Sequence, residues 1–396
     1  MTLVFDAGVL DQPGTHVLAM GVGAYTHLLG GALEKMANRP LGLGQLDSPP
    51  VSLAAFLRWL LAPVSAAGAI GFVNNQAPLA SIDALASAPV PLQVDAPGGT
   101  VTLAAATRSN IQAAFEDWLG RVNSNPDNIG IFYFCGHGIV AADHYLLADD
   151  FGQSAALPWT NAFDISTTIR ALEREVQGTV YYFIDACREI SREVAMTLGG
   201  SPSALHIVDL SKRVSRRSVT AVFATGEGAL AYAPAGGVVS RFTNALICAL
   251  SGYCGTKPSG APLWEVDGET LARAIRKLLE YETLDTTGVI GTPTQVTDQW
   301  TQGPSVPLLR LGTAPRVKVW LNLLPPDKRL AYELYLRSAS GVQHIQDGVD
   351  HAFKLEVTRG FYEVGARGLD GHSSSITYLE EELMPPCYPL IMQPQS

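Results

Sequence analysis

Two uninterrupted apolar runs, Ile129–Cys135 and Thr179–Ile184, constrain the fold more than any other feature of the sequence. A strand that is apolar on both faces must be covered on both, as in parallel sheets flanked by crossover helices. Segments with apolar residues at helical spacing occur between and beside these runs, at Thr107–Val122 and Ser166–Val176. The pattern predicts an α/β fold, an α/β/α sandwich with a mostly parallel central sheet.

Other segments continue this alternation along the chain. Residues 63–99 are rich in Ala, Pro and Gly and give no clear assignment. The remaining candidates are strands at His16–Val22 and Val219–Ala224 and helices at Ser52–Leu61, Phe242–Leu250 and Glu269–Glu282.

The sequence changes in character after about Pro315, where short strand-like runs are broken by Pro, Gly and Asp. These features predict a small all-β module, sandwich-like, which we expect to span residues 313–396 behind a larger domain at residues 1–312. The runs are Val317–Leu323, Leu330–Leu336, Phe353–Val357, Phe361–Ala366 and Ser375–Leu379.

Composition excludes several classes of partner. The chain has 27 basic and 37 acidic residues, a net charge of −10, which disfavours nucleic acid or an acidic membrane surface as the main partner. The apolar stretch Leu53–Val73 is interrupted by Arg58 and Pro63, which favours a buried helix and a loop over a membrane span. Five cysteines without disulfide or zinc spacing, and no visible secretory signal, predict a reducing cytoplasm.

Chemistry-bearing residues follow both apolar runs. The sequence FCGHG places His137 after the first run, and DACRE places Cys187 after the second. Ligands and catalytic groups gather at the carboxyl ends of parallel strands. A thiol is a strong nucleophile only as the thiolate, so it needs an imidazole nearby, and glycine lets a backbone N–H approach an oxyanion. The residues predict Cys187 as nucleophile and His137 as its general base.

These motifs, with VFATGEGALAY and SRFTNAL further on, resemble the caspase-like peptidase superfamily, in particular its prokaryotic members related to metacaspases. The fifty positions between His137 and Cys187 match the spacing in caspases. The resemblance covers about residues 14–311 and leaves out the carboxy-terminal module. It implies a cysteine endopeptidase with this dyad and an oxyanion hole formed by the backbone N–H groups of Gly138 and Cys187.

The resemblance also implies a substrate pocket. In metacaspases the acid two residues before the nucleophile faces the side chain that precedes the cut, which here is Asp185. A carboxylate there favours Arg or Lys; the alternative is a structural Asp that accepts backbone N–H bonds. Cys135 is the second candidate pocket residue. The second pocket acid of metacaspases has no counterpart at Val51-Ser52-Leu53, and Asp47 is the nearest acid.

A basic cluster follows the nucleophile where caspases carry a processing linker. We expect self-cleavage there, and the alternative is a solvated loop. The substrate is expected to be a protein or peptide, with an activating protein partner or upstream protease as in regulated bacterial defence. The acidic pair Asp149-Asp150 lacks a regular ligand spacing, so neither a metal nor a cofactor is expected. The candidate cleavage residues are Lys212, Arg213, Arg216 and Arg217.

Two other interpretations stay open. One is a CHAT-type peptidase of the same clan, which depends on a large regulatory partner. The other is a catalytically inactive caspase-like scaffold. The remaining cysteines, Cys248, Cys254 and Cys387, are expected to be small buried residues.

Overall fold

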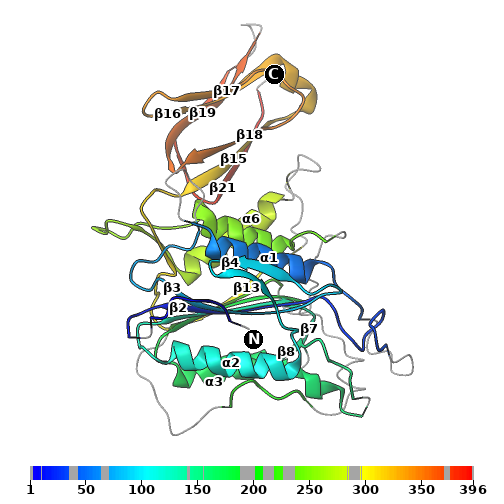
Figure 1. Ribbon diagram of the computed structural model, residues 1–396. Coiled ribbons are helices and arrows are strands. Elements are labelled where there is room, and N and C mark those ends of the chain that lie inside the picture. Colours follow the sequence, from blue (N-terminus) through cyan, green and yellow to red (C-terminus); the bar gives the residue numbers. More distant parts are fainter. Residues whose placement is uncertain are drawn as a thin grey trace.

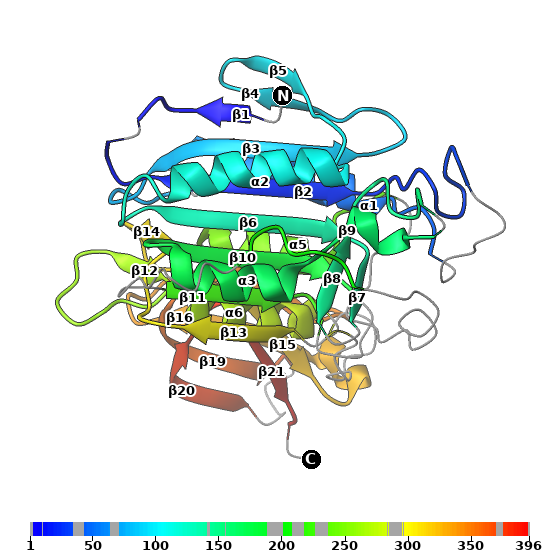
Figure 2. The same cartoon turned by 90° about the horizontal axis from the view of Figure 1, so that it is seen from below.

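The computed structural model describes residues 3–9, 11–34, 43–63, 71–140, 143–154, 156–187, 201–207, 218–225, 237–282, 284, 295, 297–369 and 375–394. Within these residues the central sheet has seven strands (Figures 1 and 2). The inner strands are parallel, and the two edge strands run antiparallel to their neighbours. The order across the sheet is β1 (Leu3–Asp6), β3 (Leu79–Ser87), β2 (Thr15–Val22), β6 (Ile129–Gly136), β10 (Thr179–Ala186), β11 (Ser218–Phe223) and β13 (Asp298–Gln302).

Helices cover both faces of this sheet (Figure 1). Side chains alternate along β6, so that Ile131 and Tyr133 enter one hydrophobic core while Phe132 and Phe134 enter the other. Both faces are therefore buried, and the predicted α/β/α sandwich is confirmed. One face carries α1 (Ser48–Leu61), α5 (Arg241–Cys248, extended by a π-helical segment, Ala249–Tyr253) and α6 (Gly268–Glu282); the other carries α2 (Arg108–Val122) and α3 (Ile165–Glu175).

The strand β3 was not assigned from the sequence, although it lies inside the sheet between β1 and β2. Its sequence, LASIDALAS, is dominated by Ala and Ser, which have little preference for strands. It also buries a charged residue, Asp83, which forms an ion pair with Arg121 of α2. A buried acid inside a strand is tolerated only with such a partner, and the sequence does not reveal the partner.

Smaller elements surround the sheet. A three-stranded sheet lies beyond the end of β6, and two antiparallel two-stranded sheets lie elsewhere on the domain. They are β7 (Gly138–Val140), β8 (His144–Leu147) and β9 (Ala162–Asp164), preceded by the 3-10 turn Pro158–Asn161; β4 (Gln93–Ala96) with β5 (Gly99–Thr102); and β12 (Trp264–Val266) with β14 (Leu309–Leu311).

The carboxy-terminal module is a small β-sandwich with its own hydrophobic core, as predicted. One expected strand begins later than predicted, because Leu330 and Ala331 belong to the 3-10 turn η4 (Pro326–Ala331). The division at residues 312 and 313 stays a prediction. Within residues 316–369 and 375–394 the module has two sheets. The first has the order β18 (Phe353–Thr358), β15 (Arg316–Leu323) and β21 (Cys387–Met392). The second has the order β17 (Gln343–Gln346), β16 (Tyr332–Ser338), β19 (Gly360–Gly368) and β20 (Ile376–Leu383).

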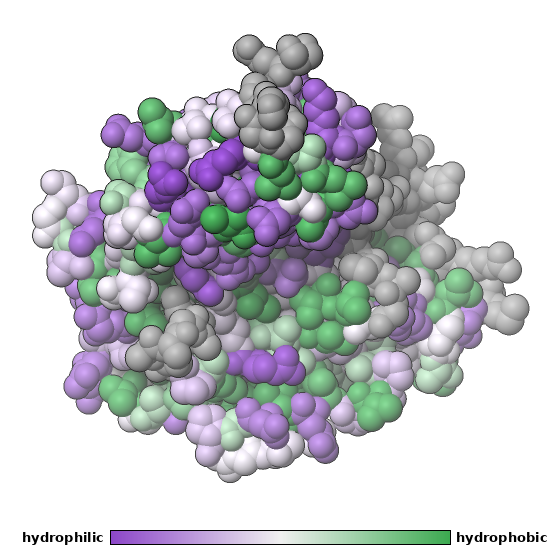
Figure 3. Space-filling model, turned by 90° about the horizontal axis from the view of Figure 1, so that it is seen from above, coloured by the Kyte–Doolittle hydropathy of each residue, from purple (hydrophilic) through white to green (hydrophobic). Residues whose placement is uncertain are grey.

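The module sits on the layer formed by α1, α5 and α6 (Figure 1). Arg316 and Lys318 of β15 lie over the ring of Tyr253, 4.3 and 4.8 Å from its centroid. Viewed from the module's side, hydrophobic and hydrophilic residues are mixed across the surface (Figure 3). Among the described residues, no helix has the length and apolar character that crossing a membrane requires.

Candidate active site

The register of β6 and β10 brings His137 and Cys187 to the same edge of the sheet, which we call the carboxyl edge. Cys135 pairs with Asp185 and Gly136 with Ala186, and the next residue on each strand is His137 or Cys187. The two main chains remain close beyond the pairing. A Cβ atom built on Gly138 would lie 2.6 Å from the carbonyl oxygen of Cys187. Only glycine fits this approach without displacing one of the two main chains.

His137 is fixed by three contacts. Its backbone N–H donates to the hydroxyl of Tyr25 at 2.7 Å, and the two rings lie 4.8 Å apart between centroids. Its Nε2 lies 2.8 Å from the carbonyl oxygen of Gly44. Because a carbonyl only accepts, Nε2 carries the proton and Nδ1 is left as the basic nitrogen. Burial lowers the pKa of His137, and the hydrogen bond to Gly44 partly opposes that shift.

The segment that carries Gly44 is anchored to the loop after β2. The side chain of Gln45 accepts the backbone N–H of Tyr25 at 2.7 Å and donates to its carbonyl oxygen at 3.0 Å. The backbone N–H of Leu46 donates to Gly23 at 2.8 Å. Sequence reasoning missed Tyr25, Gly44 and Gln45. The position of Tyr25 just past a buried strand was the signal that could have found it.

Cys187 is partly exposed, as is Cys248, whereas Cys135, Cys254 and Cys387 are buried. None of the five cysteines forms a disulfide. Burial raises the pKa of the Cys135 thiol well above its usual range and that of Cys248 to about 11. Burial likewise raises the pKa values of Cys254 and Cys387 to about 12. These four remain neutral thiols near pH 7, and a neutral thiol is a poor nucleophile.

Asp185 lies in a buried polar cluster that joins β6, β10, α1 and α5. Only 5% of its surface is exposed. Its Oδ2 accepts from the hydroxyls of Ser240 and Thr243, the latter at 2.7 Å, and from the thiol of Cys135 at 3.5 Å. Burial raises the pKa of Asp185, and these hydrogen bonds oppose the shift. The backbone N–H of Ser240 in turn donates to Ser52 of α1 at 2.9 Å.

The structure thus brings Asp185 and Cys135 together and adds Ser240 and Thr243, which sequence reasoning had not named. Ser240 also caps α5, because its hydroxyl oxygen accepts the backbone N–H of Thr243 at 3.1 Å. A serine three residues before a threonine at the start of an apolar run was the available signal. Asp47 lies exposed just before α1. The basic cluster Lys212–Arg217 lies outside the described residues.

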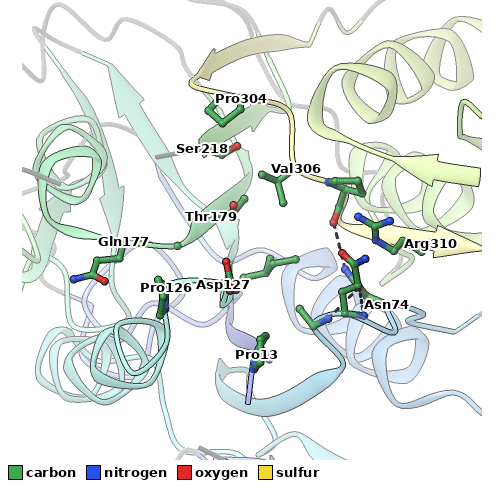
Figure 4. A pocket seen from close by; sticks show the side chains of 15 residues that line it. Pro13, Asn74, Pro126, Asp127, Gln177, Thr179, Ser218, Pro304, Val306 and Arg310 are labelled. Atoms are coloured by element: carbon green, nitrogen blue, oxygen red, sulfur yellow. Dashed lines mark hydrogen bonds between the residues drawn. The ribbon is translucent and has the colours of Figure 1, made fainter. Parts of the chain in front are cut away.

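A cavity of about 730 Å³ occupies the opposite edge of the sheet, which we call the amino edge (Figure 4). Ile129, Thr179 and Ser218, the first residues of three strands, border it. Two of the polar groups there have partners: Asn74 donates to the carbonyl oxygens of residues 307 and 308 (3.3 and 3.1 Å), and Arg310 pairs with Glu265 at 2.6 Å. No group of three or more His, Cys, Asp or Glu suited to a metal occurs among the described residues.

A parallel sheet with an imidazole and a thiol at neighbouring carboxyl ends defines a class, the caspase-like cysteine peptidases. The model of the caspase domain family matches residues 70–301, more than half of the chain, and includes both residues. The chain belongs to this family.

Two further similarities were found. An uncharacterized protein, y4kE, of Sinorhizobium fredii is 36% identical over 277 residues, which cover 69% of this chain and 77% of that protein. The crystal structure of caspase-1 from Spodoptera frugiperda is also similar. The match covers 78% of this chain and 96% of the caspase-1 chain, with a TM-score of 0.40 and 11% sequence identity.

Proposed function

We propose that this chain is a cysteine endopeptidase in which Cys187 is the nucleophile and His137 the general base. The observation that carries the proposal is their position: they follow two paired parallel strands at the same register. The hydrogen bond from Nε2 of His137 to Gly44 supports it, because it orients the ring and leaves Nδ1 as the proton acceptor.

The chemistry follows from these groups. The sulfur of Cys187 attacks the carbonyl carbon of the scissile peptide bond while its proton moves to Nδ1 of His137. The backbone N–H groups of Gly138 and Cys187 stabilise the oxyanion. The imidazolium then protonates the leaving amine, and water hydrolyses the thioester that remains. The close approach of Gly138 to the Cys187 main chain supports this oxyanion hole.

We further propose that the enzyme cuts after Arg or Lys, with Asp185 and Cys135 contributing to the pocket. The support is the carboxylate of Asp185, two residues before the nucleophile. The hydroxyls of two residues and the thiol of Cys135 hold it in place. A guanidinium or ammonium group paired with such a largely buried carboxylate forms a strong charge-assisted bond.

A positional library of fluorogenic peptides tests both proposals. The wild type should release the fluorophore fastest when Arg or Lys precedes the cut, and the Cys187→Ala variant should release none. Preference for Asp or for large apolar residues would overturn the specificity and leave the dyad standing. No turnover by the wild type, with or without added cell extract, would favour an inactive scaffold.

The third part of the proposal is that the enzyme is regulated by self-cleavage. We propose that it acts as an effector that a partner protein or another protease activates. A peptidase selective for basic residues carries Lys212, Arg213, Arg216 and Arg217 within its own chain. Mass spectrometry after prolonged incubation should find fragments ending at these residues in the wild type alone. An intact wild type that still cleaves peptides would contradict self-cleavage.

A further inference from the structure

The strand β15 connects the module to the helical layer of the peptidase domain. Val319 and Leu321 point into the core of the module, so the alternate side chains of Trp320 and Asn322 point the other way. Trp320 borders a cavity of about 270 Å³ together with residues of α5 and α6. The hydroxyl of Tyr281 in α6 lies 3.5 Å from the carbonyl oxygen of Val319. We call this contact between the module and the helical layer the seam. It lies where β15 and β21 meet α6 (Figure 1).

A second cavity, of about 390 Å³, continues the seam and shares Trp320 and Lys354 with the first. Its wall combines Asn322 from β15, Arg329 from η4 and His351 from the segment before β18. The volume is within the range of pockets that hold small molecules. The seam therefore contains a solvent-open cavity with a distinct set of side chains.

Asn322 is the first indication that a ligand binds there. Its side chain is almost fully buried, with 1% of the residue exposed. Its Oδ1 accepts the backbone N–H of Leu323 at 2.9 Å, whereas its Nδ2 has no hydrogen-bond partner. Buried polar groups in proteins are nearly always hydrogen-bonded, so a donor of this kind favours a ligand that brings an acceptor.

Arg329 is the second indication. Its guanidinium donates to two backbone carbonyl oxygens, of Leu323 at 3.3 Å and of Asp350 at 3.0 Å. No carboxylate of the described residues lies within ion-pair distance of it. A guanidinium fixed in this way keeps N–H groups for a further acceptor and is oriented before binding.

The charges in this cavity favour an anion. Arg329 is cationic, and His351 and Asn322 supply further nitrogen donors. The carboxylate of Asp350 lies on the rim, where its side chain is 90% exposed and sits 3.6 Å from His351. Donors on the wall therefore outnumber acceptors, while Trp320 provides an apolar surface.

We propose that this seam cavity binds a small anionic molecule through carboxylate or phosphate oxygens, held by Arg329 and the Nδ2 group of Asn322. The site is separate from the dyad and does not depend on peptidase activity. Because its walls come from both the module and the segment after α6 (Leu284), binding would stabilise the contact between them.

Isothermal titration calorimetry of the full chain at constant ionic strength tests the proposal, with citrate and pyrophosphate as probes. At least one should bind saturably at one site per chain, and the stronger of the two identifies the anion class. Arg329→Gln should weaken that binding about tenfold or more, since it removes a charge-assisted bond. Lys328→Gln is the matched control, because Lys328 is the preceding residue of η4 and does not line the cavity.

Asn322→Leu provides an independent check by removing the buried donor while keeping the volume similar. It should weaken binding as well, and thermal unfolding will show whether the variant folds. If it does not fold, the comparison of Arg329→Gln with Lys328→Gln still tests the site. Absence of saturable binding by both probes would overturn the site. Equal weakening by Lys328→Gln and Arg329→Gln would do the same, because it would indicate a general surface charge effect.

Discussion

The two edges of the central sheet differ in the residues that they carry. The amino edge has the cavity of about 730 Å³, bordered by the beginnings of β6, β10 and β11. The carboxyl edge has His137 and Cys187, the residues that follow β6 and β10. In α/β proteins, catalytic residues gather where parallel strands end, whatever the cavities elsewhere. Cavity volume alone would therefore point to the amino edge, whereas the proposed dyad lies at the carboxyl edge.

The electrostatics of the edges differ as well. At the amino edge Arg310 is neutralised by Glu265, and the amide of Asn74 binds backbone oxygens. At the carboxyl edge burial lowers the pKa of His137 and raises that of Asp185. Perturbed pKa values are common at functional sites, but burial also lowers the pKa of His16 near the amino edge, so the contrast rests on the position of His137 and Cys187. The comparison predicts that substitutions at the carboxyl edge change catalysis and that those at the amino edge do not.

The largest effect is expected from the dyad. Cys187→Ala or His137→Ala should reduce kcat/KM for a basic peptide by about 10⁴-fold or more, because the two residues act as one unit. The double variant should lose no more than either single one. Steady-state kinetics with a fluorogenic peptide measures this, and circular dichroism confirms folding.

The matched control lies at the other edge. Asp127→Asn changes an exposed residue of the amino-edge cavity and should leave kcat/KM within twofold (about 0.4 kcal/mol). A loss of activity there similar to that of the dyad variants would contradict the contrast between the edges, and would make the cavity part of the active site.

A smaller effect is expected at Gly138. Gly138→Ala would place a methyl group 2.6 Å from the carbonyl oxygen of Cys187 and 2.7 Å from Nε2 of His144. The main chain must shift, which misplaces an oxyanion donor and should lower kcat by about 10²-fold. Gly120→Ala is the control, because its new methyl group would meet no atom within 4 Å. Full activity of Gly138→Ala would exclude this glycine from the oxyanion hole.

The sequence was sufficient for β2, β6, β10 and β11 because each is a predominantly apolar run, and β6 and β10 also end in recognisable motifs. It failed where a polar residue interrupts a strand, as Asp83 does in β3. It also failed at β21, where Pro389 lies within an edge strand that pairs on one side only. Proline in a run argues against a strand, and only the sheet reveals that this position is at an edge.

The site shows the same division. His137 and Cys187 could be predicted because each is marked by its neighbours in sequence. Gly44 and Thr243 could not, because their contacts with His137 and Asp185 join positions 93 and 58 residues apart. No local pattern encodes such a contact, since it depends on how the helices and loops pack over the carboxyl edge.

Substrate selectivity should respond more weakly than turnover. Asp185→Asn keeps the shape of the side chain and allows the hydroxyls of Ser240 and Thr243 to accept from the new amide. The ratio of kcat/KM for Arg-containing over Gln-containing peptides should fall about tenfold, because a charge pair becomes a neutral hydrogen bond. Thr243→Val is the control for packing without loss of charge. An unchanged ratio in Asp185→Asn would make this acid a structural link between β10 and α5.

The smallest effect is a shift with pH, and it compares a histidine at each edge. At the amino edge, near the start of β2, burial and then the charge of Arg121 lower the pKa of His16 to about 4, with Asp6 opposing. His137 is lowered by burial at the carboxyl edge. Both are therefore neutral in the folded chain at a pH where they bind protons when unfolded, with an ordinary pKa of about 6.5.

Because the unfolded chain binds more protons, the stability provided by each histidine is complete above about pH 6.5 and is lost as the pH falls through its folded pKa. Each contributes a slope of at most about 1.4 kcal/mol per pH unit. His16→Asn should flatten the acid loss of stability in urea titrations. It should leave the acid limb of kcat/KM in place, below pH 6.5, since that limb reports the neutral His137 base. If His16→Asn moved the acid limb of kcat/KM, the two edges would be coupled. An acid limb above about pH 6.5 would mean that His137 is not the titrating base.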